Sequence, residues 1–304
     1  MKFFDVYKFQ VITQFIEPAL FPTYKGSTLR GAFGVTFKNI VCVNKKIPDC
    51  EKCIISSKCV YKQIFEPDIF KEDKTLDIPS PFVLEPPYDK KTEYKKGDSF
   101  EFQCVVVDKA VDYFPYFVIT FKEIGKRGLG IKGNRGRFKL LKMKNSHRII
   151  YDEKTDTLKD FKKPVNLIIP KIKDDMITLK FISPIRIKIG SKLISDIPFS
   201  LFLKVLLRRI SLLNKYYCEE KTIIMNYNEL LEKANFISTV RSNLQWYDWE
   251  RFSSRQKQVM RLGGFTGTIT YKGNLKEFLP FIKLGEIIHI GKNTSFGLGK
   301  YIIK

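Results

Sequence analysis

The order of the elements predicted in the second half of the chain constrains the fold more than any other sequence feature. Residues 176–187 alternate apolar and polar side chains, as a strand does, and residues 198–215 place apolar residues at helical spacing after Pro198. The same patterns and the turn residues predict strands 239–247 and 265–272, a helix 275–287 and a strand 298–303. The predicted order is therefore βαββαβ.

The first half of the chain divides in the same way. Its predicted elements are a strand 3–13, a helix 26–40, an extended segment near 81–85, a strand 99–108, a helix 110–124 and a strand 136–144. A βαββαβ order is typical of the split βαβ, ferredoxin-like sheet with helices on one face. We therefore predict an α+β protein of two tandem ferredoxin-like (RRM-like) domains, 1–150 and 151–304, with a Cys-rich insertion at 42–98 in the first.

Both halves end with a helix, a glycine-rich basic loop and a strand. The loops are GKRGLGIKGNRGRF at 125–138 and GKNTSFGLGKY at 291–301. Glycine lets the backbone approach a ligand closely, so such loops can direct amides and cationic side chains at phosphates. Either loop alone could be a simple turn, but two basic copies at matching positions favour RNA binding. The residues predicted to contact RNA here are Lys126, Arg127, Lys132, Arg135 and Arg137, and Asn293, Thr294, Ser295 and Lys300.

The charge of the chain favours a polyanionic partner. Lys and Arg total 54 against 32 Asp and Glu, a formal net charge of +22, and the basic residues are spread along the whole chain. A lysine-rich proteome could produce the same balance without nucleic acid. Because the chain has no apolar run of 18 residues, we expect a soluble, cytoplasmic protein with no membrane partner.

A polar, basic segment separates two of the predicted strands of the second half. It contains Arg251, Ser253, Arg255, Gln256 and Lys257. Such a hairpin can hold an RNA stem through its phosphates, and nearby Trp246 and Trp249 offer stacking faces. The alternative is a solvated loop. We predict that this segment binds RNA.

The last 60 residues resemble the C-terminal module of the CRISPR repeat-processing endoribonucleases of the RAMP superfamily. HIGKNTSFGLGKY is similar to the terminal glycine-rich signature of that family, and RFSSRQ followed by GGFTG is similar to its preceding hairpin. FPTYKGSTLRGAFG, CEKCIISSKCVYKQIFEP and LLRRISLLNKYYC, at 21–34, 50–67 and 206–218, also resemble segments of this family.

The resemblance implies tandem ferredoxin-like domains and cleavage of precursor CRISPR RNA within each repeat without a catalytic metal. The 2′-hydroxyl beside the scissile phosphate attacks it, leaving a 2′,3′-cyclic phosphate and a 5′-hydroxyl. The expected partner is CRISPR repeat RNA. An alternative is a non-catalytic RAMP subunit that binds crRNA among the other subunits of a CRISPR effector complex. A general RNA-binding adaptor with two RRM-like sheets is disfavoured, because the sequence lacks the aromatic RNP pattern.

This reaction needs a base, an acid and positive charge on the phosphate. The chain has two histidines. His289 comes at the end of the last predicted helix and Lys292 follows it in the glycine-rich loop, so both are candidate catalytic residues. Alternatively, His289 is structural and satisfies backbone carbonyls at the helix end. His147 is interpreted as a surface residue.

The family resemblance implies a general-base histidine near the first helix, with a tyrosine just before it. This chain departs from that pattern, because it has Tyr24 there but no histidine between residues 1 and 146. Tyr24 is therefore the third catalytic candidate, although a phenol with a pKa near ~10 is a poor base. Lys25 and Arg30 are candidates for contact with the scissile phosphate.

Four of the six cysteines crowd into the predicted insertion. Cys42, Cys50, Cys53 and Cys59 have the spacing C-x7-C-x2-C-x5-C, and the C-x2-C core suits one tetrahedral ion. We predict a structural zinc, with an iron–sulfur cluster or four reduced thiols as alternatives. Catalysis itself is expected to need no cofactor.

Overall fold

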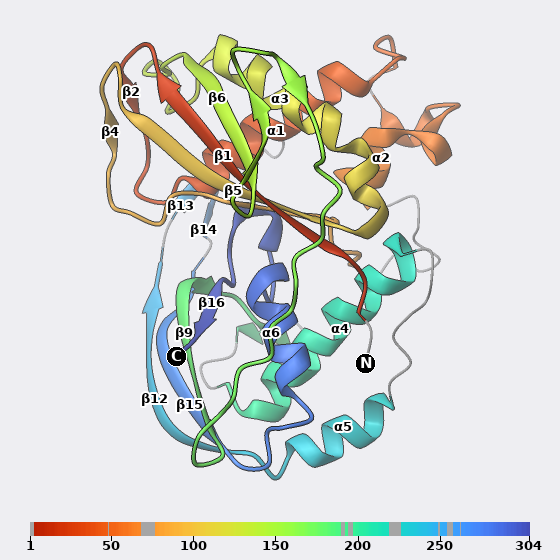
Figure 1. Cartoon of the computed structure of the whole chain (residues 1–304), viewed down its shortest axis with the longest axis vertical. Coiled ribbons are helices and arrows are strands. Elements are labelled where there is room, and N and C mark those ends of the chain that lie inside the picture. Colours follow the sequence, from red (N-terminus) through yellow and green to blue (C-terminus); the bar gives the residue numbers. More distant parts are fainter. Residues whose placement is uncertain are drawn as a thin grey trace. The chain divides into compact units, whose positions relative to one another are not determined.

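The second half of the chain folds with the predicted order of elements in the computed structural model (Figure 1). Its main elements are β9 (Met176–Ile185), α4 (Phe199–Tyr217), β12 (Ser238–Tyr247), β15 (Gly264–Lys272), α6 (Leu279–Ile288) and β16 (Tyr301–Ile303). The connection between α4 and β12 holds a helix that the sequence did not predict, α5 (Tyr227–Ala234). The structure describes residues 3–47, 49–67, 77–189, 192–193, 197–218, 226–248, 250–253, 258–261 and 263–304.

Two compact units make up the chain. The N-terminal unit comprises Phe4–Val165 and Leu213–Glu220. The C-terminal unit comprises Met1–Phe3, Asn166–Leu212 and Lys221–Lys304. The N-terminal unit thus continues past the predicted boundary at residue 150, because β7 (Arg148–Asp152) and β8 (Thr157–Leu158) extend its sheet as a hairpin.

The sheet of the C-terminal unit has the antiparallel order β12-β15-β9-β16. In order of sequence this is second, third, first and fourth, the arrangement of a split βαβ sheet. Helices α4 and α6 pack on the face that carries Tyr271 and Tyr301. Phe199 of α4 meets Tyr271 at 5.1 Å between ring centroids, and the hydroxyl of Tyr301 donates to the carbonyl of Ile282 on α6 at 2.6 Å.

The N-terminal unit repeats this strand order in a larger sheet. Its elements are β1 (Val6–Phe15), α1 (Gly26–Val41), β3 (Phe82–Glu85), β5 (Ser99–Val107), α3 (Phe114–Arg127) and β6 (Phe138–Asn145), and the sheet order is β3-β5-β1-β6-β7-β8. The predicted helix 110–124 begins as a 3₁₀ segment, Asp108–Tyr113, before α3.

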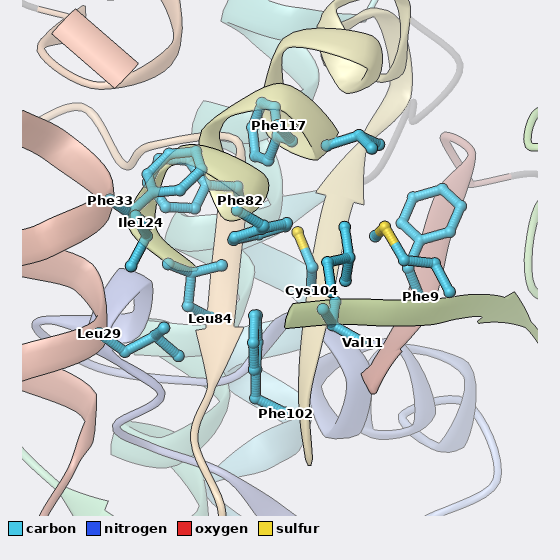
Figure 2. Packing of buried hydrophobic residues seen from close by; sticks show 14 of the residues in the cluster. Phe9, Val11, Leu29, Phe33, Phe82, Leu84, Phe102, Cys104, Phe117 and Ile124 are labelled. Atoms are coloured by element: carbon cyan, nitrogen blue, oxygen red, sulfur yellow. The ribbon is translucent and has the colours of Figure 1, made fainter. Parts of the chain in front are cut away.

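Aromatic side chains form most of the core beneath α1 and α3 (Figure 2). Alternate residues of β1, among them Phe9, Val11 and Phe15, point into this core because successive side chains of a strand face opposite sides. Phe33 of α1 packs on Phe117 of α3 at 4.9 Å between ring centroids. The core therefore fixes α1 and α3 on one face of the sheet.

The segment that follows α1 packs on the N-terminal core through Phe65, the residue that ends α2 (Val60–Ile64). It contains 3₁₀ segments Cys50–Lys52 and Ser56–Lys58 before α2, and β3 follows within the range 42–98 predicted as an insertion. A Cβ on Gly34 would lie 2.0 Å from Cζ of Phe65, so only glycine lets α1 accept this ring.

The remaining strands form three small ribbons. β2 (Ala19–Leu20) pairs with β4 (Glu93–Tyr94), β10 (Lys188–Ile189) with β11 (Lys192–Leu193), and β13 (Glu250–Ser253) with β14 (Gln258–Arg261). Among the described residues, no helix is long and apolar enough to cross a membrane.

Candidate functional site

The glycine-rich loop of the C-terminal unit is folded back onto β9 and α6. Gly299 donates its amide to the carbonyl of Pro184 at 3.0 Å, and Ile290 donates to the carbonyl of Gly299 at 3.1 Å. A Cβ on Gly299 would lie 1.7 Å from the carbonyl oxygen of Ile290, and its φ of +72° disfavours any other residue. The loop is thus held by backbone contacts that require glycine.

His289 lies inside this fold-back. It is the residue that ends α6, with a φ of 65°, and its side chain is fully buried. Its Nδ1 is 2.9 Å from the carbonyl oxygen of Leu298, which makes Nδ1–H the donor. The imidazole therefore ties the two ends of the loop together, and RNA could reach it only if the loop opened.

The other residues predicted in this loop differ in exposure. Lys292 and Asn293 are partly exposed, whereas Thr294 and Ser295 are buried. Lys292 donates its amide to the carbonyl of Arg186 at 2.9 Å, which fixes its backbone to the end of β9. The Lys300 ammonium donates to the carbonyl of Glu286 at 2.9 Å. Both cations of this loop, Lys292 and Lys300, are partly exposed.

A serine of β9 that was not predicted from the sequence supports the loop. Ser183 of β9 donates its hydroxyl to the carbonyl of Gly297 at 2.7 Å and accepts the amide of Lys300 at 2.9 Å. It was detectable in principle, because it stands at an inward position of β9 where the alternation calls for an apolar residue. Arg209 of α4 also supports this region, because its Nε donates to the buried carbonyl of Ile288 at 3.0 Å.

The glycine-rich loop of the N-terminal unit is built differently, with its cations on the surface. Ile131 donates its amide to the carbonyl of Leu20, and Leu20 donates to the carbonyl of Asn134, so the loop is clamped on β2. All five predicted basic residues are exposed, and they are Lys126, Arg127, Lys132, Arg135 and Arg137.

Ion pairs divide these five cations into two groups. Lys126 and Arg127 both pair with Glu123, and Arg137 pairs with Glu17, which its Nε meets at 2.8 Å. Within the described part of the chain, Lys132 and Arg135 form no ion pair. Their full charge is therefore available to a phosphate.

The predicted residues at the start of α1 are held by the N-terminal core. Lys25 is fully buried, and its ammonium is 2.8 Å from Oδ1 of Asp89. Arg30 stacks on the ring of Phe65 at 3.7 Å. Burial, with a smaller effect of the Glu85 charge, raises the pKa of Tyr24 well above 10, so its hydroxyl is protonated at neutral pH. Tyr24 can therefore donate a hydrogen bond but cannot serve as a base.

The predicted basic hairpin is described only in part. Arg251 and Ser253 lie on β13, which pairs with β14. Arg255, Gln256 and Lys257 lie outside the described residues, as does Trp249. Trp246 on β12 is 43% exposed.

The four cysteines of the predicted metal site are partly buried between α1 and α2. Cys50 contacts the Lys38 ammonium, and this contact raises the pKa of Lys38. Among the described residues, no three Cys, His, Asp or Glu side chains are gathered so that they could hold a metal ion. The metal site remains a prediction.

Family models match both halves of the chain. Residues 4–163 match the AF_1859_N N-terminal domain family. Residues 179–301, which include most of β9, the basic hairpin and the C-terminal glycine-rich loop, match the model for the CRISPR-associated endoribonuclease Cas6. Residues 179–301 are therefore a domain of the Cas6 family.

Solved Cas6 structures share the fold of this chain at low sequence identity. A Cas6 product complex matches at a TM-score of 0.58 and 14% identity, covering 98% of this chain and 100% of that one. Thermus thermophilus Cas6 matches at 0.55 and 12%, with all of both chains covered. A partial Cas6-RT-Cas1–Cas2 complex matches at 0.57 and 15%, covering 100% of this chain and 46% of that one. No curated protein sequence matches this chain.

Proposed function

We propose that this chain binds and cleaves precursor CRISPR RNA within its repeats. The 2′-hydroxyl beside the scissile phosphate attacks it without a catalytic metal, giving a 2′,3′-cyclic phosphate and a 5′-hydroxyl. The match of residues 179–301 to the Cas6 endoribonuclease family carries this proposal. The strand order common to both sheets supports the assignment of each unit as a ferredoxin-like module.

Electrostatic stabilisation of the phosphate is the catalytic contribution that the described residues support best. Lys292 is partly exposed on a loop whose backbone is fixed to Arg186, so its ammonium can meet a phosphate without reordering the loop. The buried Nδ1–H bond to Leu298 supports a positioning role for His289, which acts on Lys292 through the loop. On the N-terminal unit, the partly exposed Tyr24 is proposed to contact RNA as a neutral phenol.

RNA binding is proposed to rest on phosphate contacts spread over both units. The exposed cations Lys132 and Arg135 offer charge that no carboxylate offsets within the described residues. Such contacts set the position of the RNA, whereas discrimination between repeats requires contacts to bases.

Single-turnover cleavage of an end-labelled repeat RNA tests the function. We expect one cut, at equal rates in EDTA and in Mg²⁺. Lys292→Ala should lower the rate by about tenfold or more with little change in RNA affinity, because its charge acts mainly in the transition state. Lys276→Ala, at an exposed lysine of the C-terminal unit, is the matched control and should cut at the wild-type rate.

Two results would contradict the proposal. Tight binding of an all-ribose repeat RNA without any cleavage would contradict nuclease activity and favour the alternative, a non-catalytic subunit that binds crRNA. Cleavage that EDTA abolishes would replace the metal-independent reaction with a metal-dependent one.

A further inference from the structure

Trp246 presents a rigid aromatic surface at the end of β12. Its indole meets the ring of Phe265 at 5.0 Å between centroids with an interplanar angle of 76°, and the strand register places the two residues opposite each other. A Cβ on Gly263 would lie 2.2 Å from Cζ2 of Trp246, so the indole lies directly against the glycine backbone. The ring is held by these contacts, yet the residue remains 43% exposed.

One cation, Arg186, lies close to this ring on the same unit. Arg186 donates Nη1–H to the carbonyl of Gly263 at 3.0 Å, and its own carbonyl accepts the amide of Lys292 at 2.9 Å. Hydrogen bonds therefore connect the backbone under Trp246 to the glycine-rich loop. Asp248 also lies next to Gly263 and interacts with Arg186, so it offsets part of the positive charge.

A supported, half-exposed aromatic ring beside a cation suits a nucleobase whose phosphate is held nearby. Every base has a π-face that stacks on an aromatic side chain, and removing such a contact weakens binding by about fivefold to a hundredfold. Within a duplex, both faces of a base are covered by its neighbours. The occupant that fits Trp246 is therefore an unpaired base.

We propose that Trp246 is a stacking platform for one unpaired nucleobase of the bound RNA, next to a phosphate held by Arg186. The proposal rests on the proposed function only in taking RNA as the ligand, and it does not require that the RNA be cut. The competing explanation is that Trp246 merely covers Phe265 and Gly263.

Fluorescence can isolate this indole, because the chain has two tryptophans. In a Trp249→Phe variant, Trp246 is the sole indole. We expect a repeat RNA with a single 2′-deoxy substitution at the cut position to quench its emission at saturation. The same RNA annealed to its full complement should bind through its phosphates without quenching. Equal emission with and without saturating unpaired RNA would overturn the proposal.

Substitutions separate stacking from packing. Trp246→Leu keeps an apolar cover over Gly263 but removes the π-face, and it should weaken binding of the unpaired RNA by about fivefold to a hundredfold. Its melting temperature and its affinity for the duplex should stay close to wild type, and Trp246→Phe should recover most of the lost affinity. The matched control is Tyr247→Leu, because Tyr247 is 38% exposed on the opposite face of β12 and should contribute little.

The outcomes distinguish this proposal from the nuclease. Quenching of Trp246 emission without cleavage of all-ribose RNA would contradict the proposed nuclease activity and support the stacking proposal. Cleavage of the RNA without quenching of Trp246 emission would contradict the stacking proposal and support the proposed nuclease activity. Equal losses of affinity for paired and unpaired RNA in Trp246→Leu, with a lower melting temperature, would establish that the indole only packs.

Discussion

Gly299 determines the path of the C-terminal loop, and its substitution is the sharpest residue-level test of the fold-back. In Gly299→Ala, the new Cβ would collide with the carbonyl of Ile290, so the loop must move and the hydrogen bond from Ile290 must break. We expect a loss of about 2–4 kcal/mol in the stability of the C-terminal unit, measured by urea unfolding. RNA cleavage should fall as well, because Lys292 would lose its position.

Gly31→Ala is the matched control for that prediction. Gly31 lies within α1, and a Cβ there would meet nothing within 4 Å. Alanine favours the helix over glycine, so this variant should gain about 0.5–1 kcal/mol. Equal stability of Gly299→Ala and the wild type would contradict the close approach that defines the loop.

The position of His289 was predictable, but its burial was not. The sequence places it correctly at the end of the last helix, before the glycine-rich loop. His289 is buried because residues 297–299 turn back over it. Hydrogen bonds from this loop to Ser183 and Pro184, which lie more than 100 residues earlier in the chain, hold that turn in place. A basic, glycine-rich pattern is equally compatible with an open loop, so local sequence could not reveal the closed one.

At the level of elements, the N-terminal glycine-rich loop 125–138 makes a quantitative prediction about RNA binding. Lys132 and Arg135 are exposed and make no ion pair with described residues, whereas Arg137 is paired with Glu17. Changing Lys132 and Arg135 together to alanine should weaken binding and reduce the slope of log K against log salt by about 1.4, since each phosphate contact contributes ~0.7 for single strands.

Arg137→Ala should change affinity and salt slope less than either of the other two substitutions, because Glu17 already neutralises Arg137. Fluorescence anisotropy with labelled repeat RNA at several salt concentrations measures both quantities. A salt slope that the double variant leaves unchanged would exclude the loop from the interface.

The cysteine segment between α1 and α2 makes a second element-level prediction. If Cys42, Cys50, Cys53 and Cys59 bind zinc, the purified protein should contain about one zinc per chain by elemental analysis, and Cys53→Ser should lose it. Cys218→Ser, at the end of α4, should retain it. Protein that is purified under reducing conditions and binds no added zinc would favour the alternative of four free thiols.

At the level of the whole molecule, two sheets with the same strand order could be predicted because the hydrophobic periodicity is strong and repeated. The predicted strands 99–108 and 265–272 agree with β5 and β15 to within one residue at each end. The β7–β8 hairpin and α5 were missed, because each element is at most eight residues long and spans too few residues for a period to be recognised. The predicted sites on loops depended on tertiary contacts that no local pattern contains.

The tyrosines of the N-terminal unit predict how stability changes at alkaline pH. Burial raises the pKa of Tyr7 to about 12 and raises those of Tyr24, Tyr61, Tyr94 and Tyr151 above 10. The unfolded chain therefore loses these protons first, at a pH near ~10. This contribution to stability is present below pH ~10 and is lost as the pH rises through the folded-state pKa values.

This pH dependence of stability can be measured by thermal unfolding in which phenolate absorbance is the signal that reports on the tyrosines. The melting temperature should fall as the pH rises above ~10, and the absorbance of these tyrosines should appear together with unfolding. Absorbance of all 14 tyrosines in the folded protein near pH ~10 would contradict their burial.

The chemistry of the cut ends tests the central claim most directly. Mass spectrometry of both fragments of a repeat RNA incubated in EDTA should find a 2′,3′-cyclic phosphate on the upstream fragment, one water lighter than a linear phosphate, and a 5′-hydroxyl on the downstream fragment. A single 2′-deoxy substitution at the cut should abolish both fragments. A 3′-hydroxyl with a 5′-phosphate, or cleavage that persists at the deoxy position, would contradict attack by the RNA's own 2′-hydroxyl.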